Sequence, residues 1–175
     1  MESPFLRDLI EFFIQLCLLR RAPQDLPVSS ALLGLALIAD LAVGTVLGAV
    51  VALSPMLTLA EGLVDVLFTL GLLYLALQLL DRLPRFHQTA TALLGAGALL
   101  GLLAIVPLSF MSSGQPSEQS ALAGLLFLAL LAWSILVMGH ILRHSFDLRL
   151  GQGVVVAIAY NLLSFFLISV IFSGS

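Results

Sequence analysis

Five apolar stretches, each of 21 residues or more, constrain this chain more than any other feature of its sequence. They occupy positions 28–53, 56–80, 88–110, 119–142 and 152–172. A helix of about 20 apolar residues is long enough to cross the hydrocarbon core of a bilayer. We therefore predict an all-α integral membrane protein, with a transmembrane domain of five helices over 28–172.

The composition excludes several classes of protein. Of the 175 residues, 61% are apolar and 10% are charged, and the mean hydropathy is +1.16, which a water-soluble domain does not tolerate. A formal net charge of -3 provides no basic surface for nucleic acid. The sequence shows no nucleophile paired with a base and no glycine-rich phosphate loop after a strand. We therefore expect neither an enzyme nor a cofactor.

The arginines predict the orientation. All seven basic residues are arginines outside the apolar stretches: Arg7, Arg20, Arg21, Arg82, Arg85, Arg143 and Arg149. Five crossings bring all of them to one side of the membrane, which the positive-inside rule makes cytoplasmic. We therefore expect a cytoplasmic N-terminus and a short outside tail at 173–175.

The segment 1–27 is predicted to contain a cytoplasmic amphipathic helix. Its apolar residues recur on one side, and its polar residues on the other: Phe5, Leu9, Phe12, Phe13 and Leu16 against Asp8, Glu11 and Gln15. Such a helix lies in the plane of the membrane interface. It either anchors against the bundle or serves to dock a partner or sense the membrane. The single cysteine, Cys17, is expected to pack as a small hydrophobe.

Three acidic residues lie inside apolar stretches that contain no arginine. Asp40 is about 18 Å along the first helix, and Asp65 is about 22 Å from the arginine-flanked end of the second. A tight turn at Ser54–Pro55 would bring the two acids to similar depth. Glu61 precedes Asp65 by four residues and shares its helix face. The resulting polar stripe consists of Thr58, Glu61, Asp65 and Thr69.

A charged carboxylate at mid-membrane costs about 2.5–3.5 kcal/mol, so these acids need a reason to be there. In one interpretation, neutral carboxyls hydrogen-bond to Thr69, to Asn161 or to backbone and hold helices together. In a second, the acids relay protons or bind a cation. In a third, they pair with an arginine of a partner protein. The sequence leaves all three open.

Small residues at helical spacing predict close helix packing. The first stretch has Gly44 and Gly48, the third has Gly97 and Gly101, and the fifth has Gly153 on the same face as Asn161. These motifs do not specify whether the neighbouring helix belongs to this chain, to a second copy or to another membrane protein. The bilayer, a homo-oligomer and other membrane proteins are therefore the expected partners.

No metal site is expected. The only spacing that would offer a ligand set places His140 and His144 four residues apart, with Asp147 three residues later. All three lie where the fourth stretch ends, flanked by arginines. Histidines are common there as interfacial polar groups.

The sequence WSILVMGHILRH, from Trp133 to His144, leads through Leu150 and Gly151 into the last stretch. With five spans, a cytoplasmic N-terminus and a short second-to-third loop, this pattern resembles the Yip family, both the Rab-GTPase-interacting type and its short bacterial relatives. The resemblance covers about 28–172. It implies no catalytic residues, a role in membrane organisation or trafficking, and partners on the cytoplasmic side. For a bacterial relative it implies the cytoplasmic (inner) membrane.

Two functions follow from these observations. The first is a non-enzymatic membrane scaffold or accessory subunit of a membrane complex, with Asp40, Glu61 and Asp65 buried and hydrogen-bonded. The alternative is a small proton- or cation-coupled transporter that uses the same three acids. A transporter requires a water-accessible path that reaches the carboxyl groups from at least one side.

Overall fold

The computed structural model describes residues 4–112 and 118–173, and within these ranges it is entirely helical. The elements are α1 (Pro4–Cys17), η1 (Pro23–Asp25), α2 (Ser30–Val50), α3 (Pro55–Leu79), η2 (Leu83–Arg85), α4 (Phe86–Met111), α5 (Glu118–Phe146) and α6 (Leu150–Phe172). The side chain of Phe5 and most of the predicted tail at 173–175 lie outside the described residues.

The prediction of five apolar helices is confirmed, because α2 to α6 are each long and apolar enough to cross a membrane. Their lengths differ: α2 has 21 residues and α5 has 29, which correspond to about 31 and 43 Å. α5 continues beyond 142, where the apolar stretch ends, as far as Phe146. Contacts with α4 stabilise this polar last turn, since the Ser145 hydroxyl lies 2.8 Å from that of Thr89.

The α2–α3 turn forms as its sequence predicts. Pro55 is the first residue of α3, where a proline loses no helical hydrogen bond. The Ser54 hydroxyl caps the helix by accepting a hydrogen bond from the Leu57 amide at 3.1 Å. The two helices are therefore joined by only a few residues and run back along each other.

Four helices end without glycine. Leu19, Ala52, Asp81 and Asp147 follow α1, α2, α3 and α5 and have φ between 54° and 62°. After each of them the next amide donates back to a carbonyl of the last turn, as Leu53 does to Gly48 at 3.0 Å. This is the Schellman arrangement, which normally places glycine at the left-handed position. Side chains at these positions carry a steric cost.

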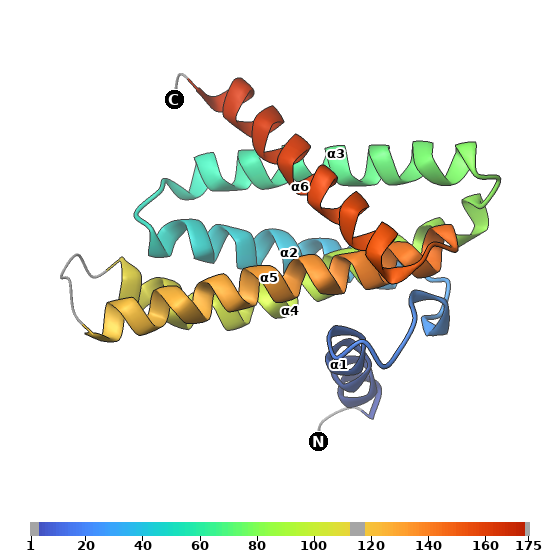
Figure 1. The fold of residues 1–175 in the computed structure, drawn as a ribbon, viewed down its shortest axis with the longest axis horizontal. Coiled ribbons are helices and arrows are strands. Elements are labelled where there is room, and N and C mark those ends of the chain that lie inside the picture. The colour runs from blue at the N-terminus through green and yellow to red at the C-terminus, as the bar shows by residue number, and fades with distance from the viewer. Residues whose placement is uncertain (1–3, 113–117, 174–175) are drawn as a thin grey trace.

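The helices form a layered bundle (Figure 1). α4 packs against α2 and α5, α2 also packs against α3, and α5 packs against α6. α6 then runs obliquely across the bundle and touches α3. α4 therefore lies centrally and connects the α2–α3 pair with the α5–α6 pair.

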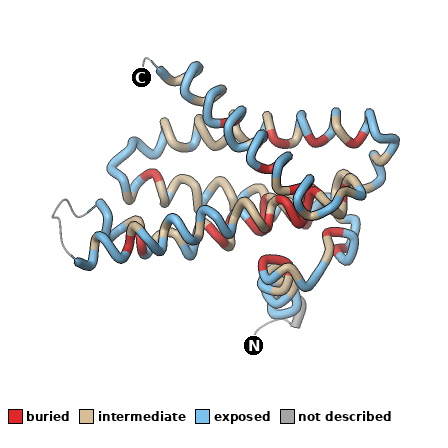
Figure 2. The backbone as a smooth tube through the Cα atoms, in the orientation of Figure 1, coloured by how far each residue is buried: buried red, intermediate tan, exposed pale blue. Residues whose placement is uncertain are grey.

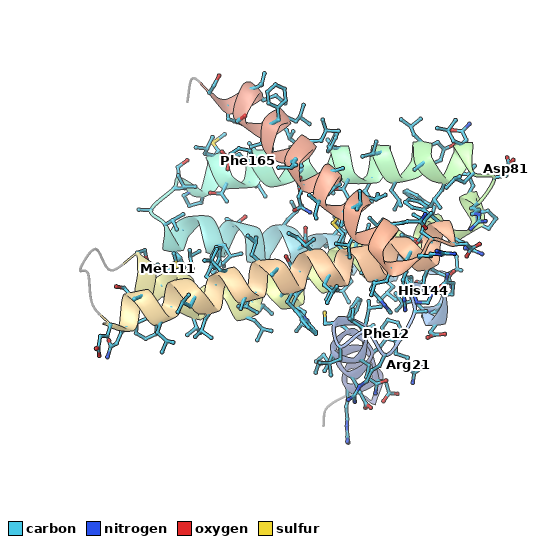
Figure 3. All side chains as sticks on the ribbon, viewed as in Figure 1. Phe12, Arg21, Asp81, Met111, His144 and Phe165 are labelled. Carbon is cyan, nitrogen blue, oxygen red and sulfur yellow. The ribbon has the colours of Figure 1, made fainter. Side chains whose placement is uncertain are left out.

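The two ends of the bundle differ in packing. We call the end where α2, α4 and α6 begin and α3 and α5 finish the arginine-bearing end; Asp81 lies there and Met111 lies at the opposite end (Figure 3). Buried residues concentrate toward the arginine-bearing end (Figure 2). Leu77, Ala90 and Ile141 are fully buried there. Toward the opposite end, most of α5 and α6 presents exposed leucine and phenylalanine side chains.

α1 is set off from the bundle and lies across it (Figure 1). Its Leu16 is fully buried, and Phe13 occupies the space beside Gly95 of α4, where a Cβ would collide with the phenyl ring. On another side of the helix, Ile10 and Ile14 are exposed. α1 is therefore held by apolar contacts with α4 and α5 and retains a second, uncovered apolar side.

Candidate functional site

Two carboxyl groups from different helices line the same space inside the bundle. Asp40 of α2 and Asp65 of α3 both border a cavity of about 360 Å³ that also touches α4, α5 and α6. Both border a second cavity of about 260 Å³ on the side of α2 and α3. The two cavities share Asp40, Asp65 and Gly97 among their walls. The acids therefore stand where the two cavities adjoin.

Asp65 is held by hydroxyl groups of α6. The Tyr160 hydroxyl donates to its Oδ1 at 3.2 Å, and the Ser164 hydroxyl donates to the same oxygen. Thr69, one turn further along α3, contacts the Tyr160 hydroxyl and donates to the Asp65 carbonyl at 2.7 Å. Phe68 stacks on the Tyr160 ring with centroids 6.0 Å apart. This network fixes where α6 crosses α3.

The hydroxyl groups in this network have more contacts than protons. Each of Thr69, Tyr160 and Ser164 carries a single O–H. Tyr160 therefore donates either to Asp65 or to Thr69, and Thr69 donates either to Tyr160 or to the Asp65 carbonyl. The hydroxyl protons can therefore be placed in two ways while the heavy atoms stay where they are. Such a chain can change its proton positions by rotation of hydroxyl groups alone.

Asp40 has a different environment. Its Oδ1 lies only 2.7 Å from the position that a Cβ would take at Gly97, so the carboxyl group fills the space that the glycine leaves on α4. Within residues 4–112 and 118–173, Asp40 accepts no hydrogen bond and forms no ion pair, although it is only partly exposed. Asp40 borders both cavities.

Glu61 and Thr58 extend the site along α3. Both line the second cavity together with Asp40 and Asp65. Thr58 is seven residues from Asp65, so this wall extends about 10 Å toward the turn that joins α2 and α3. Thr69, the last member of the predicted stripe, lines the first cavity. The stripe is thus a wall of the two cavities.

Among the residues that the structure describes, neither cavity has a basic residue in its wall. Charges interact strongly in a low-dielectric interior, so any ionised carboxylate there attracts a proton or another cation. Toward the arginine-bearing end a third, smaller cavity of about 70 Å³ follows beyond Thr69 and Tyr160. Its other lining residues are apolar. The polar lining therefore stops near Tyr160 on the arginine-bearing side, and in the second cavity it continues past Glu61 to Thr58 toward the opposite end.

Asn161 does not contact either carboxyl group, which removes it from the predicted set of hydrogen-bond partners. It borders the first cavity and is exposed. Its amide donates to the Ala157 carbonyl at 2.8 Å, within its own helix. Tyr160 and Ser164, its neighbours on α6, contact Asp65 instead.

The glycine pair of α4 faces α2 of the same chain. Gly97 lies against Asp40, and a Cβ at Gly101 would be 2.7 Å from the Val43 side chain. Gly48 of α2 lies against Thr58 of α3, whereas Gly44 has no atom within 4 Å of its Cβ position.

α5 and α6 cross through a second pair of glycines. Gly153 lies against the backbone of Gly139, and a Cβ at Gly139 would be 2.8 Å from the backbone nitrogen of Val154. Gly153 and Ala157 are both buried at this crossing. The sequence pattern singled out Gly153 but not its partner Gly139, which lies 14 positions earlier in the chain.

The three weak metal candidates serve other contacts. The rings of His140 and His144 are 4.7 Å apart, and the His140 Nε2 lies 2.8 Å from the Arg21 carbonyl oxygen. Asp147 pairs with Arg82 and with Arg85, the latter at 2.9 Å. The hydrogen bond from Arg85, with the two positive charges, holds the pKa of Asp147 below its usual range. In the described part of the chain no three such side chains are grouped for a metal.

Side-chain hydrogen bonds also fasten the N-terminal segment to the bundle. The Trp133 indole donates to the Cys17 carbonyl at 3.0 Å, which satisfies one of the free carbonyls at the end of α1. Gln24 donates to the His144 carbonyl at 2.6 Å, and Gln88 donates to the Leu26 carbonyl at 2.6 Å. None of these pairs is local in sequence, and the sequence analysis did not identify them.

Comparison with known proteins yields no match: neither a family model, nor a curated protein, nor a solved structure matches this chain.

Proposed function

We propose that the protein is a non-enzymatic integral membrane protein that moves protons or small cations through an intramembrane carboxyl site. The observation that carries this proposal is that Asp40 and Asp65, on different helices, line two adjoining cavities whose walls contain no basic residue. Ionisable groups inside a membrane are candidates for ion and proton pathways, because an unused charge there is costly.

The roles of the acids differ in this proposal. Asp40 is the exchanging site, since it borders both cavities and accepts no hydrogen bond from the described residues. Asp65 passes protons to and from the hydroxyl chain of Tyr160, Thr69 and Ser164. Glu61 lines the approach from the α2–α3 turn. Asn161 borders the first cavity and contributes polarity to it.

The membrane orientation belongs to the same proposal. With the seven arginines on the cytoplasmic side, α1 lies at the cytoplasmic interface and the C-terminus outside. The exposed Ile10 and Ile14 of α1 then face lipid, and the approach past Glu61 opens toward the outside. We infer the bacterial cytoplasmic membrane from the Yip-like pattern of Trp133 to Gly151.

A Yip-like scaffold or accessory subunit is the second candidate. One observation favours it: Asp65 accepts two hydroxyl hydrogen bonds from α6, which is how a carboxyl group that only joins helices would be placed. In that case the acids hold α3 and α6 together for a partner protein or a second copy, and no ion crosses.

Proton flux in proteoliposomes distinguishes the two. Protein is reconstituted into potassium-loaded vesicles that contain a pH-sensitive dye, and valinomycin sets a potential that drives protons inward. The test variants are Asp40→Asn and Asp65→Asn. The matched control is Asp81→Asn, which removes an exposed carboxylate at a turn and places there an asparagine, a residue that tolerates its positive φ.

We expect flux in the unmodified protein and in Asp81→Asn, and its loss in Asp40→Asn. The same measurement with sodium or rubidium gradients tests small cations. If all four proteins are folded, incorporated equally and impermeable to protons and to both cations, the transport proposal is wrong and the scaffold is supported.

A further inference from the structure

The larger cavity has the shape and lining of a site for an organic molecule. Its volume of about 360 Å³ lies in the range of small-molecule sites, about 300–1,000 Å³. A bare metal ion would leave most of it empty, and the described residues hold no group of three metal ligands around the acids. The cavity is therefore large enough for an occupant that has an organic body as well as a charge.

Polar and apolar groups lie at different levels of this cavity. The Asp40 carboxyl group lies against Gly97, and Asp65 borders the same cavity. Ala104 lies seven residues further along α4, so the wall continues about 10 Å toward the opposite end of the bundle. At that level the lining is apolar and includes Phe127 of α5. An occupant that matches both levels has one charged head and an apolar body.

The head is cationic. Asp40 and Asp65 are the only ionisable carboxylates in the wall, and no arginine or histidine accompanies them there. The Tyr160 ring, which also borders the cavity, has Phe68 on one face. Aromatic rings attract ammonium groups through their faces. Carboxylates and an aromatic ring together are the usual lining for an organic cation.

On the basis of the proposed function, we propose that the larger cavity binds a monovalent organic cation, an ammonium compound with an apolar body, whose head lies at Asp40 and Asp65 and whose body lies along Ala104 and Phe127. The ligand class follows from the juxtaposition of two carboxyl groups, with no basic residue among the described residues of the wall, and an apolar cavity of this volume.

Binding of benzyltrimethylammonium to the purified protein in nanodiscs of zwitterionic lipid tests this proposal. The probe is permanently charged, carries an aromatic body and cannot donate a proton. Neopentylbenzene, in which carbon replaces the ammonium nitrogen, is the matched neutral competitor. Equilibrium dialysis with radiolabelled probe measures saturable binding. The comparison of the probe with neopentylbenzene is made on the unmodified protein, so it does not depend on whether a variant folds.

We expect saturable binding that neopentylbenzene does not displace. Asp40→Asn should weaken it at least about tenfold through loss of the head contact, which corresponds to about 1.4 kcal/mol. Ala104→Phe should weaken it at least about tenfold by filling the apolar level. Asp81→Asn should bind as the unmodified protein does.

The outcomes separate this inference from the proposed function. If proton or rubidium flux depends on Asp40 but the probe does not bind, the organic-cation assignment is wrong and the transport proposal stands. If the neutral isostere displaces the probe, the carboxyl groups do not select the ligand and the assignment is also wrong. If the probe binds as expected but nothing is transported, the cavity is a cation-binding site and the transport proposal fails.

Discussion

Replacing Gly139 with alanine tests the crossing of α5 and α6. A Cβ at this position would lie 2.8 Å from both the nitrogen and the Cα of Val154. Ordinary carbon contacts are about 3.5–4.0 Å, so α6 has to move away by roughly 1 Å. The obstructing atoms belong to the backbone, so no change of rotamer relieves the clash. Overpacking of this kind costs about 1–3 kcal/mol.

Gly71→Ala is the matched control. No atom lies within 4 Å of the Cβ position at Gly71, which is an exposed position in α3. Both substitutions gain the same helix propensity, about 0.8–1.0 kcal/mol. The difference between the two variants therefore isolates the packing cost, and Gly139→Ala should be less stable than Gly71→Ala by about 1–3 kcal/mol.

Unfolding in mixed micelles, titrated with sodium dodecyl sulfate and followed by tyrosine and tryptophan fluorescence, measures this difference. A Gly139→Ala protein as stable as Gly71→Ala would refute the close approach of the two backbones. The same shift has a second expected effect. A displacement of α6 by about 1 Å at the crossing should break the 3.2 Å hydrogen bond between the Tyr160 hydroxyl and Asp65.

Three further predictions concern the loops and the N-terminal segment. Ala52→Gly should stabilise the protein by up to about 1 kcal/mol, because it removes a side chain from a left-handed position; equal or lower stability in the same titration would contradict the strain. Burial raises the pKa of the Cys17 thiol from 9.0 to about 11, and the thiolate is the reactive form, so maleimide labelling at pH 8 should be roughly 100-fold slower than for an ordinary cysteine; labelling at the ordinary rate would show that α1 is undocked. The pKa of Asp147 is lowered in the folded state. Its contribution to stability is therefore present above the unfolded pKa of about 3.9 and is lost as the pH falls through the folded value. Asp147→Asn should lack this acid-labile component, and an unchanged dependence of stability on acid pH would argue against the pairing with Arg85.

Local rules in the sequence account for the elements but not for their partners. The proline and serine at the α2–α3 turn act through neighbouring residues, so position 55 was identifiable as a helix start. The Gly97 and Gly101 pair predicted close packing, and the structure adds that the neighbour is α2. Which helices meet depends on the three-dimensional arrangement of all of them. A spacing rule within one helix does not specify its neighbours.

In the candidate site, too, the sequence predicted the positions of residues along their helices but not their contacts. Depth along the helices placed Asp40 and Asp65 at a similar level, and both line the same cavities. Asn161 was one of several hydrogen-bond partners that the sequence left open; in the structure its amide donates within α6, and Tyr160 and Ser164 contact Asp65. Both hydroxyl residues were visible as polar groups in an apolar stretch. Only the crossing angle of α6 decides which of them reach the acid.

The ion pairs and the attachment of α1 had no local signal at all. Asp147 and Arg82 are 65 positions apart, and Trp133 and the Cys17 carbonyl are 116 apart. Each contact depends on long-range packing at the arginine-bearing end. Tryptophan at position 133 entered the sequence analysis through a family pattern, and its role as a hydrogen-bond donor to the end of α1 is a feature of the fold.

In the proposed membrane orientation, the unequal helix lengths make the protein sensitive to the thickness of the bilayer. A hydrocarbon core of about 30 Å accommodates α2 almost without tilt, whereas α5, about 43 Å long, exceeds it by roughly 13 Å. The surplus of α5 includes its final turns with Arg143 and His144, which favour water. A thicker bilayer would draw these turns and the attached α1 toward the hydrocarbon, and a thinner one would release them. Lipid chain length should therefore bias how α1 sits on the bundle, at a cost of fractions of a kcal/mol per Å.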